Sequence, residues 1–253
     1  MSVSMAEMQL ALNELLRPND FRDYCPNGLQ VEGKEQIANI VTGVTASLAL
    51  IEAAIEKGAD AILVHHGYFW KGEDPTITSI RKSRIKLLLD NDINLFAFHL
   101  PLDAHPQMGN NAQLGLKLGF NTEADLDPKH KSRVGVWGSL EEPCSGADLA
   151  ERITKQLHRA PFHIPGSKKI IEKIGWCTGS AQSYIELAHD AGVDAYLTGE
   201  VSEQTVHFAR ETGLHFFAAG HHATERYGVQ AVGQYLAGEF GIDHEFVDID
   251  NPV

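Results

Sequence analysis

A short, wholly apolar run, Ala61-Ile62-Leu63-Val64, is the feature that most constrains the fold of this chain. An unbroken apolar run of this length is typical of a strand that is buried on both faces of a parallel sheet. Upstream, residues 40–44 predict another strand, and a helical stretch over about residues 47–57 ends at Gly58. Together these segments predict a β-α-β unit, and its second strand leads directly into His65-His66.

The same unit recurs further along the chain. A shift of 134 in the numbering superimposes parts of the helix and strand on later equivalents: Gly58 on Gly192, Asp60-Ala61 on Asp194-Ala195 and Leu63 on Leu197. At the position of His65-His66, the second copy has Gly199-Glu200. A shift of 122 aligns the next strands and the histidines after them, residues 94–98 before His99 and residues 216–220 before His221. We therefore expect two related halves whose polar residues lie at the carboxyl ends of parallel strands, where open sheets bind ligands.

The predicted class is an α/β protein of two pseudo-symmetric halves with mainly parallel strands and a metal site at the strand ends between them. We place the first half at residues 1–125 and the second at 126–225, and we expect the C-terminal residues 226–253, a helix and a last strand, to pack back on the first half. Residues from about Arg133 to Gly166 do not fit the repeat, and we interpret them as an α/β addition within the second half.

Composition excludes several classes of protein. The formal net charge of −13 argues against dedicated nucleic-acid binding, which needs a basic surface. The 3 cysteines are far apart and in no metal-binding or disulfide spacing, as is usual for reduced thiols in a cytoplasm. At the N-terminus, Ser4 and Glu7 predict a capping box and a helix rather than a signal peptide, and no apolar run is long enough to span a membrane. We expect a soluble, cytoplasmic protein.

Histidines paired with carboxylates indicate metal binding. The chain has 13 histidines, and each of two strands is followed by a His and an acid four residues later, His99 with Asp103 and His221 with Glu225. Such pairs lie on one face of a helical turn. A single pair, or His65-His66 alone, is often structural, but their combination after matching strands favours a site for two divalent ions. Imidazole and carboxylate ligands suit Zn, Fe, Mn, Co or Ni, and a water shared by two such ions is a source of hydroxide for hydrolysis.

Several segments resemble a known family of dinuclear metal proteins: Pro26-Asn27-Gly28-Leu29-Gln30, Val64-His65-His66-Gly67, His99-Leu100-Pro101-Leu102-Asp103, Thr198-Gly199-Glu200 and Gly220-His221-His222-Ala223-Thr224-Glu225. The family is named for the yeast Ngg-interacting factor, and its bacterial members are called GTP cyclohydrolase I type 2 homologues. The chain is similar to the short, YbgI-like bacterial form. The resemblance implies a hexameric ring and metal ligation by His65, His66, Asp103, His221 and Glu225, with Glu225 as the bridge.

The roles of two further residues stay open. His99 is either a proton carrier beside the metals or a buried histidine bonded to a backbone carbonyl. Glu200 is either a general base or ligand-orienting group, or a carboxylate that favours a helix N-terminus. The preferred function is a metal-dependent, GTP cyclohydrolase-like hydrolase acting through metal-bound hydroxide on a nucleotide or related heterocycle. The alternatives are a metal-binding regulator or carrier without catalysis, and a metal-dependent phosphodiesterase or phosphatase.

Overall fold

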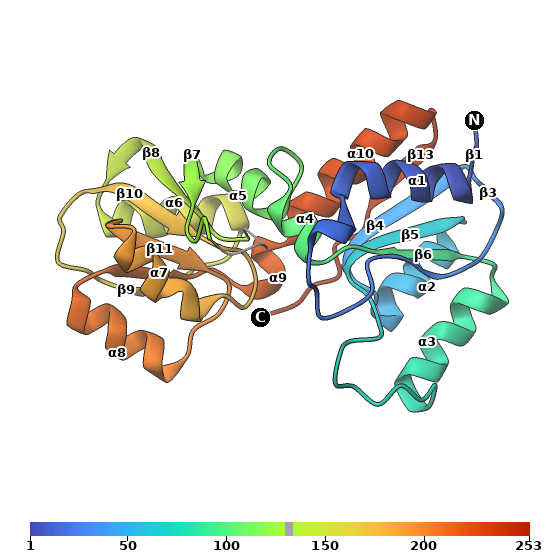
Figure 1. Cartoon of the computed structure of the whole chain (residues 1–253), viewed down its shortest axis with the longest axis horizontal. Helices are drawn as coiled ribbons and strands as arrows, with labels where there is room; N and C mark the ends of the chain where they lie inside the picture. Colours follow the sequence, from blue (N-terminus) through green and yellow to red (C-terminus); the bar gives the residue numbers. More distant parts are fainter. Residues whose placement is uncertain (130–133) are drawn as a thin grey trace. The chain divides into compact units, whose positions relative to one another are not determined.

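In the computed structural model, which describes residues 1–129 and 134–253, the chain forms two units (Figure 1). The first comprises Met1–Leu102 and Gly228–Asp250, and the second comprises Asp103–Tyr227 and Asn251–Val253. Each combines a sheet with helices, so the predicted α/β class is confirmed. The strands are mainly parallel, as expected, in the first unit only, because three of the five pairings in the second unit's sheet are antiparallel. Arg133, the expected start of the addition, lies outside the described residues.

The first unit is built on a sheet of strand order β13-β4-β5-β6-β2, in which β2 alone of these strands pairs antiparallel. Its strands are β1 (Val3–Ser4), β2 (Gly28–Val31), β3 (Gln36–Ile37), β4 (Asn39–Thr45), β5 (Ala61–His66), β6 (Asn94–Ala97) and β13 (Asp243–Phe246), with β1 and β3 pairing separately. Its helices are α1 (Met5–Leu16), α2 (Leu48–Glu56), α3 (Ser79–Asp90) and most of α10 (Arg226–Phe240), with a 3-10 turn at Pro18–Asp20. One apolar core joins α2 and α3 to the sheet through Leu50, Ile62 and Leu88.

The second unit contains a sheet of order β7-β8-β10-β11-β12-β9, with β10, β11 and β12 parallel. Its strands are β7 (Phe120–Asp125), β8 (Val136–Cys144), β9 (Phe162–Ile164), β10 (Ile171–Trp176), β11 (Ala195–Thr198) and β12 (His215–Ala218). Its helices are α5 (Asn110–Leu118), α6 (Gly146–Leu157), α7 (Ile185–Asp190), α8 (Glu203–Thr212) and α9 (His221–Thr224), with a 3-10 turn at Gln182–Tyr184, and α4 (Leu100–Ala104) leads into the unit. Trp176 is fully buried in the core that joins α5 and α6 to this sheet.

The predicted repeat is visible in matching hydrogen bonds. In the first unit, the Asp60 carboxylate accepts from Lys34 Nζ at 2.6 Å and from the N–H groups of Ala38 and Asn39. In the second unit, Asp194 accepts from Lys168 Nζ at 2.9 Å and from the N–H groups of Glu172 and Lys173. All four pairs of equivalent residues differ by 134 in number. Each aspartate therefore fastens the strand that starts the unit's parallel sheet to the strand that follows it.

The structure corrects the expected register of the next strand. Ala61 pairs with Asn94, and Ala195 pairs with His215, so the two strands correspond at a shift of 121 rather than 122. Gly220 is the extra residue, placed between β12 and His221 with φ of 100°. A residue with a side chain rarely adopts this backbone angle, which explains why glycine stands at the insertion.

The expected addition before Gly166 is wrong in part, because its helix α6 and strand β9 belong to the repeat. Helices α1 and α6 have 12 residues each, and both begin with a complete capping box, Ser4 with Glu7 and Ser145 with Asp148. The strands after them, β2 and β9, pair antiparallel with equivalent strands β6 and β12. This part of the second unit therefore repeats the N-terminal part of the first, although few of its residues are identical.

The division into units also differs from the expected boundary between residues 125 and 126. Helix α5 and strand β7, which follow the first set of strands in the sequence, belong to the second unit, and β7 pairs with β8. As expected for the C-terminal helix and strand, Gly228–Asp250 belong to the first unit, where β13 pairs with β4. Each unit is thus completed by a helix and a strand that follow the other unit's strands in the chain.

Candidate metal site

Three histidines gather at the carboxyl ends of β5 and β6 in the first unit. The ring centroids of His65 and His66 are 4.5 Å apart, and those of His65 and His99 are 5.1 Å apart. One ring nitrogen of each lies within 4.8 Å of the others, a spacing that could hold a metal ion. Adjacent residues of a regular strand point to opposite faces, so this proximity arises because both histidines end the strand.

Hydrogen bonds at Nδ1 orient the two neighbouring rings. His65 is fully buried, and its Nδ1 lies 3.0 Å from the carbonyl oxygen of Phe98. Since a carbonyl only accepts, Nδ1 must carry the proton, which places the lone pair of the neutral ring on Nε2. His66 Nδ1 bonds Thr45 Oγ1 at 3.1 Å. A protein group that bonds one ring nitrogen and leaves the other to face the ligand is the usual support of a metal-binding histidine.

His99 bonds a carboxylate rather than the backbone carbonyl considered above. Its ring Nδ1 lies 2.7 Å from Asp23 Oδ1, and its backbone N–H donates to Asn27 Oδ1 at 2.7 Å. Asp23 also accepts from Asn27 Nδ2 and from the N–H groups of Tyr24 and Leu100. Burial raises the pKa of Asp23, but its bond to His99 and the other hydrogen bonds outweigh that effect, so the pKa lies below the usual value. Sequence reasoning missed Asp23, although it noted the motif that contains Asn27.

Cys25 lies near Asp23 and His99 and could in principle join a metal site. Burial and the charge of Asp23 raise the pKa of its thiol to about 12. Because a metal binds the thiolate, a thiol held protonated in this way is a poor ligand.

The aromatic segment after the histidine pair has two parts with different surroundings. Tyr68 is buried, and its hydroxyl donates to the Ala46 carbonyl at 2.8 Å, so it anchors the loop. Trp70 lies edge-on to His99, with ring centroids 4.9 Å apart and planes at 85°. The indole therefore borders the histidine cluster of the first unit.

In the second unit, His221 lies between two carboxylates. Its Nδ1 is 2.7 Å from Glu200 Oε1, and its Nε2 is 3.1 Å from Glu225 Oε2, so the predicted His221–Glu225 pair shares one face. Burial opposes a charge on His221, but the carboxylates of Glu225 and Glu200 outweigh it and raise the pKa to about 9. The two neighbouring carboxylates therefore favour a positive charge at this position.

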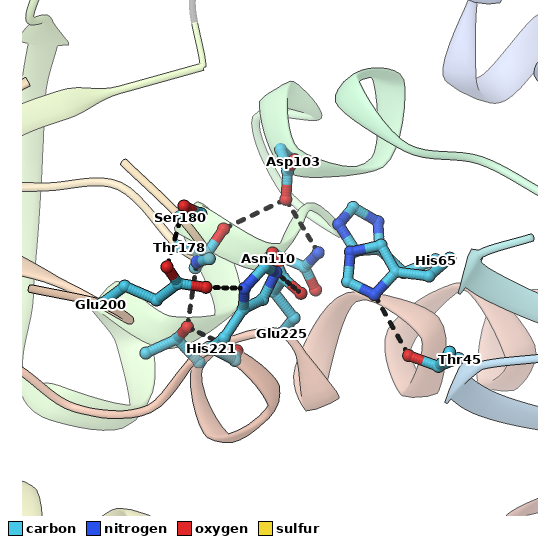
Figure 2. A network of polar contacts seen from close by, with 12 residues as sticks. Thr45, His65, Asp103, Asn110, Thr178, Ser180, Glu200, His221 and Glu225 are labelled. Atoms are coloured by element: carbon cyan, nitrogen blue, oxygen red, sulfur yellow. Dashed lines mark hydrogen bonds and ion pairs between the residues drawn. The ribbon is translucent and has the colours of Figure 1, made fainter. Parts of the chain in front are cut away.

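Glu200 does not act at a helix N-terminus. Helix α8 begins at Glu203 and is capped by Ser202, whose hydroxyl accepts from the N–H of Thr205. The Glu200 carboxylate instead accepts from His221 and from Ser180 Oγ, as the dashed lines in Figure 2 show. Glu200 therefore orients the imidazole of His221.

Asp103 is buried, and two side chains of the second unit hold it. Its Oδ1 accepts from Asn110 Nδ2 at 2.9 Å and from Thr178 Oγ1 at 3.0 Å (Figure 2). The neighbouring Gly179 has φ of 71°, and a Cβ there would overlap the carboxylate of Glu225. Sequence reasoning missed Asn110, Thr178 and Gly179, which belong to no repeated motif.

Donors in both units fit divalent metal ions. The Nδ1 bonds of His65, His99 and His221 favour Nε2 as the ligand atom, and Asp103 and Glu225 supply buried carboxylates. A cation could replace the proton that His221 holds between two acids. Clusters of His, Asp and Glu that could bind metal are therefore present, as the sequence predicts.

Comparison with known proteins identifies the family. The family model of Duf34/NIF3 (NGG1p interacting factor 3) matches residues 3–252, so the chain belongs to this family, as its motifs indicated.

Relatives named GTP cyclohydrolase 1 type 2 homolog include proteins of Haemophilus influenzae, 57% identical over 249 residues (97% of this chain, 98% of the relative), and Vibrio cholerae, 55% identical over 249 residues (98% of each). The solved structure of protein ybgI is 50% identical and superposes with a TM-score of 0.96 over 99% of this chain and 100% of that one. TTHA1606 from Thermus thermophilus is 31% identical, with a TM-score of 0.89 over 99% and 100% of the chains.

No helix in the described part of the chain is long and apolar enough to cross a membrane.

Proposed function

We propose that this protein is a metal-dependent hydrolase that binds two divalent ions through His65, His66, Asp103, His221 and Glu225. The observation that carries the proposal is the orientation of the histidines: His65 Nδ1 faces a carbonyl and His221 Nδ1 faces a carboxylate, so Nε2 is the metal-binding atom in both. The ligand set is neutral imidazole and carboxylate, which suits Zn, Fe, Mn, Co or Ni and leaves the choice among them to metal supply.

The bound ions would supply a water of lowered pKa and would polarise the bond to be hydrolysed. The protein's own residues do the rest. Asp23 holds His99 with its proton on Nδ1, so that Nε2 can accept a proton from a reacting group. Glu200 holds His221 in the metal-binding orientation, and Asn110 and Thr178 fix the carboxylate of Asp103.

The substrate class rests on the relatives. Proteins 51% to 57% identical to this chain are named GTP cyclohydrolase 1 type 2 homolog, so we propose a nucleotide or related heterocycle as substrate. Hydrolytic opening of a heterocycle needs proton transfer as well as an activated water, and the Asp23–His99 pair could carry that proton. A hexameric ring stays a prediction of the family resemblance, which light scattering of the purified protein would test. A cytoplasmic location stays a prediction from the cysteine spacing and the N-terminal sequence.

Metal analysis of variants from both units tests the ligand set. We expect His65→Ala and Asp103→Ala each to lower the bound metal by at least one ion per chain and to reduce nucleotide hydrolysis by more than about 100-fold, since each removes a direct ligand. His207→Ala is the matched control, because His207 is an exposed residue of α8. Metal content is measured by elemental analysis, and turnover by product formation from a nucleotide panel.

The outcomes separate the proposed functions. Loss of metal and turnover in both variants supports the hydrolase. Loss of metal without any turnover in the fully metallated parent would instead indicate a metal carrier or regulator. Unchanged metal content in either variant would exclude that residue from the ligand set.

A further inference from the structure

A cavity of about 580 Å³ opens in the second unit at the carboxyl ends of β11 and β12. It is lined by residues that precede β9, follow β11 and end β12, together with the C-terminal segment: Arg159, Ala160, Pro161, Phe162, Gly199, Glu200, Val201, Ala218, Pro252 and Val253. Its volume is in the range of pockets for small organic ligands, and the ends of parallel strands are the usual place for them. None of the candidate metal ligands lines this cavity.

Arg159 is the cationic side chain of the cavity lining, and Glu200 is the acidic one. No carboxylate in the described residues forms an ion pair with Arg159, although the chain has a net charge of −13. The guanidinium donates from Nη1 to the Pro252 carbonyl, whereas Nε is buried without a hydrogen-bond partner. An anionic ligand in the cavity would supply the acidic partner that the guanidinium lacks.

Phe162 gives the cavity lining an apolar, aromatic surface. Its side chain is 51% exposed, an unusual state for a phenylalanine, and it lies beside Pro161 in the cavity lining. A flat, half-exposed ring offers a surface for stacking a planar heterocycle. Together, Arg159 and Phe162 fit a ligand that carries both an anionic group and an aromatic ring.

Glu200 connects the cavity to the candidate metal ligands. It lines the cavity and accepts the Nδ1 proton of His221. Arg159 also packs closely on Gly220, since a Cβ on that glycine would lie 2.8 Å from Arg159 Nε. A ligand in the cavity would therefore contact Glu200, which bonds His221, and Arg159, which packs on the residue before His221.

We propose that this cavity binds a planar organic anion of the size of a mononucleotide, with its anionic group on Arg159 and its ring on Phe162. The assignment of this cavity as the enzyme's substrate subsite rests on the proposed hydrolase function. Glu200 then has two roles, to orient His221 and to receive a hydrogen bond from a polar edge of the bound ring.

Calorimetric titration with GMP, guanosine and ribose 5-phosphate tests the cavity. We expect GMP to bind the purified protein at least about tenfold more tightly than guanosine or ribose 5-phosphate, which lack the phosphate or the base. Arg159→Gln should weaken GMP binding about 10- to 100-fold and leave guanosine binding unchanged. Phe162→Ala should weaken GMP and guanosine about tenfold and leave ribose 5-phosphate unchanged. Arg210→Gln, an exposed arginine of α8, is the control and should change none of the three.

The same titration with Asp103→Asn separates this proposal from the hydrolase function. GMP binding that persists in this variant while metal and turnover are lost supports the cavity assignment by itself. GMP binding that is absent from the parent, or equal in the parent and the Arg159 and Phe162 variants, overturns the assignment whether or not the protein hydrolyses nucleotides.

Discussion

Each unit holds one histidine against a carboxylate, yet the two pairs differ in their surroundings. Both bonds run from Nδ1 to a carboxylate oxygen over 2.7 Å, His99 to Asp23 in the first unit and His221 to Glu200 in the second. The Asp23 side chain is 4% exposed, and its oxygens accept four hydrogen bonds. The Glu200 side chain is 33% exposed and accepts two. The buried Asp23 therefore holds His99 in one orientation, whereas the more exposed Glu200 carboxylate can also contact a ligand.

The difference arises at the strand ends and not in the scaffold. The Lys34–Asp60 and Lys168–Asp194 pairs make the same bonds in the two units. At the ends of the equivalent strands, however, His66 in one unit corresponds to Glu200 in the other. One fold thus carries imidazole groups at the strand ends of the first unit and mainly acidic groups at those of the second.

The strongest test of this comparison is Gly179→Ala. The shift of 134 makes Gly179 the equivalent of Thr45. The first unit uses the Thr45 side chain to bond His66, whereas the second unit has no side chain at this position. An alanine at Gly179 combines a strained φ of 71° with overlap of the Glu225 carboxylate. We expect a loss of about 2–4 kcal/mol in the free energy of unfolding, measured by urea denaturation, and weaker metal binding.

Gly192→Ala is the matched control for that substitution. Gly192 has φ of 70°, and a Cβ there would meet no atom within 4 Å. It should cost about 1 kcal/mol from backbone strain alone and leave metal binding unchanged. If the two variants lose equal free energy of unfolding, backbone strain alone explains the glycine at position 179, and overlap with Glu225 does not.

A smaller effect should distinguish the two histidine–carboxylate pairs. In Asp23→Asn, the amide would turn an NH₂ group toward other donors, because both carboxylate oxygens accept protons from N–H groups. We expect about 1–3 kcal/mol less stability by urea denaturation. Glu200→Gln should cost less than about 1 kcal/mol, since the Ser180 hydroxyl can accept from the new amide. A larger loss from Glu200→Gln than from Asp23→Asn would reverse the comparison.

Local patterns were sufficient to predict the elements that carry the candidate ligands. The apolar run 61–64 became β5, and Ser4 begins a helix because its hydroxyl caps the first turn, as predicted. The Asp23 contact was beyond this reasoning, since it joins residues 76 apart from a loop without periodic pattern. The equivalence of α1 and α6 was missed because capping and packing preserve a helix without preserving its residues.

The smallest expected effect concerns pH and the edge strands. His163 of β9 lies in the second unit beside His215, 3.2 Å away between Nε2 and Nδ1, and stacks on Phe217 with centroids 4.3 Å apart. Burial, followed by the charge that His215 can carry, lowers the pKa of His163 below 6.5. His244 of β13 has a lowered pKa for burial alone, which the charge of Glu245 partly opposes.

A histidine of lowered pKa favours its neutral form in the folded state. As pH falls below 6.5, the unfolded chain binds the proton first, so stability is full above that pH and is lost as the pH falls through the lower, folded value. His163→Phe keeps the stacking but cannot titrate, and it should make the fall in stability from about pH 8 to about pH 5 shallower. Urea denaturation with a chelator present, which removes the contribution of bound metal, measures both slopes. Because His163 faces a second histidine and His244 faces a threonine hydroxyl, His244→Phe should flatten the slope less. An equal or greater change with His244→Phe would show that burial, and not the neighbouring imidazole, sets the response of both units to acid.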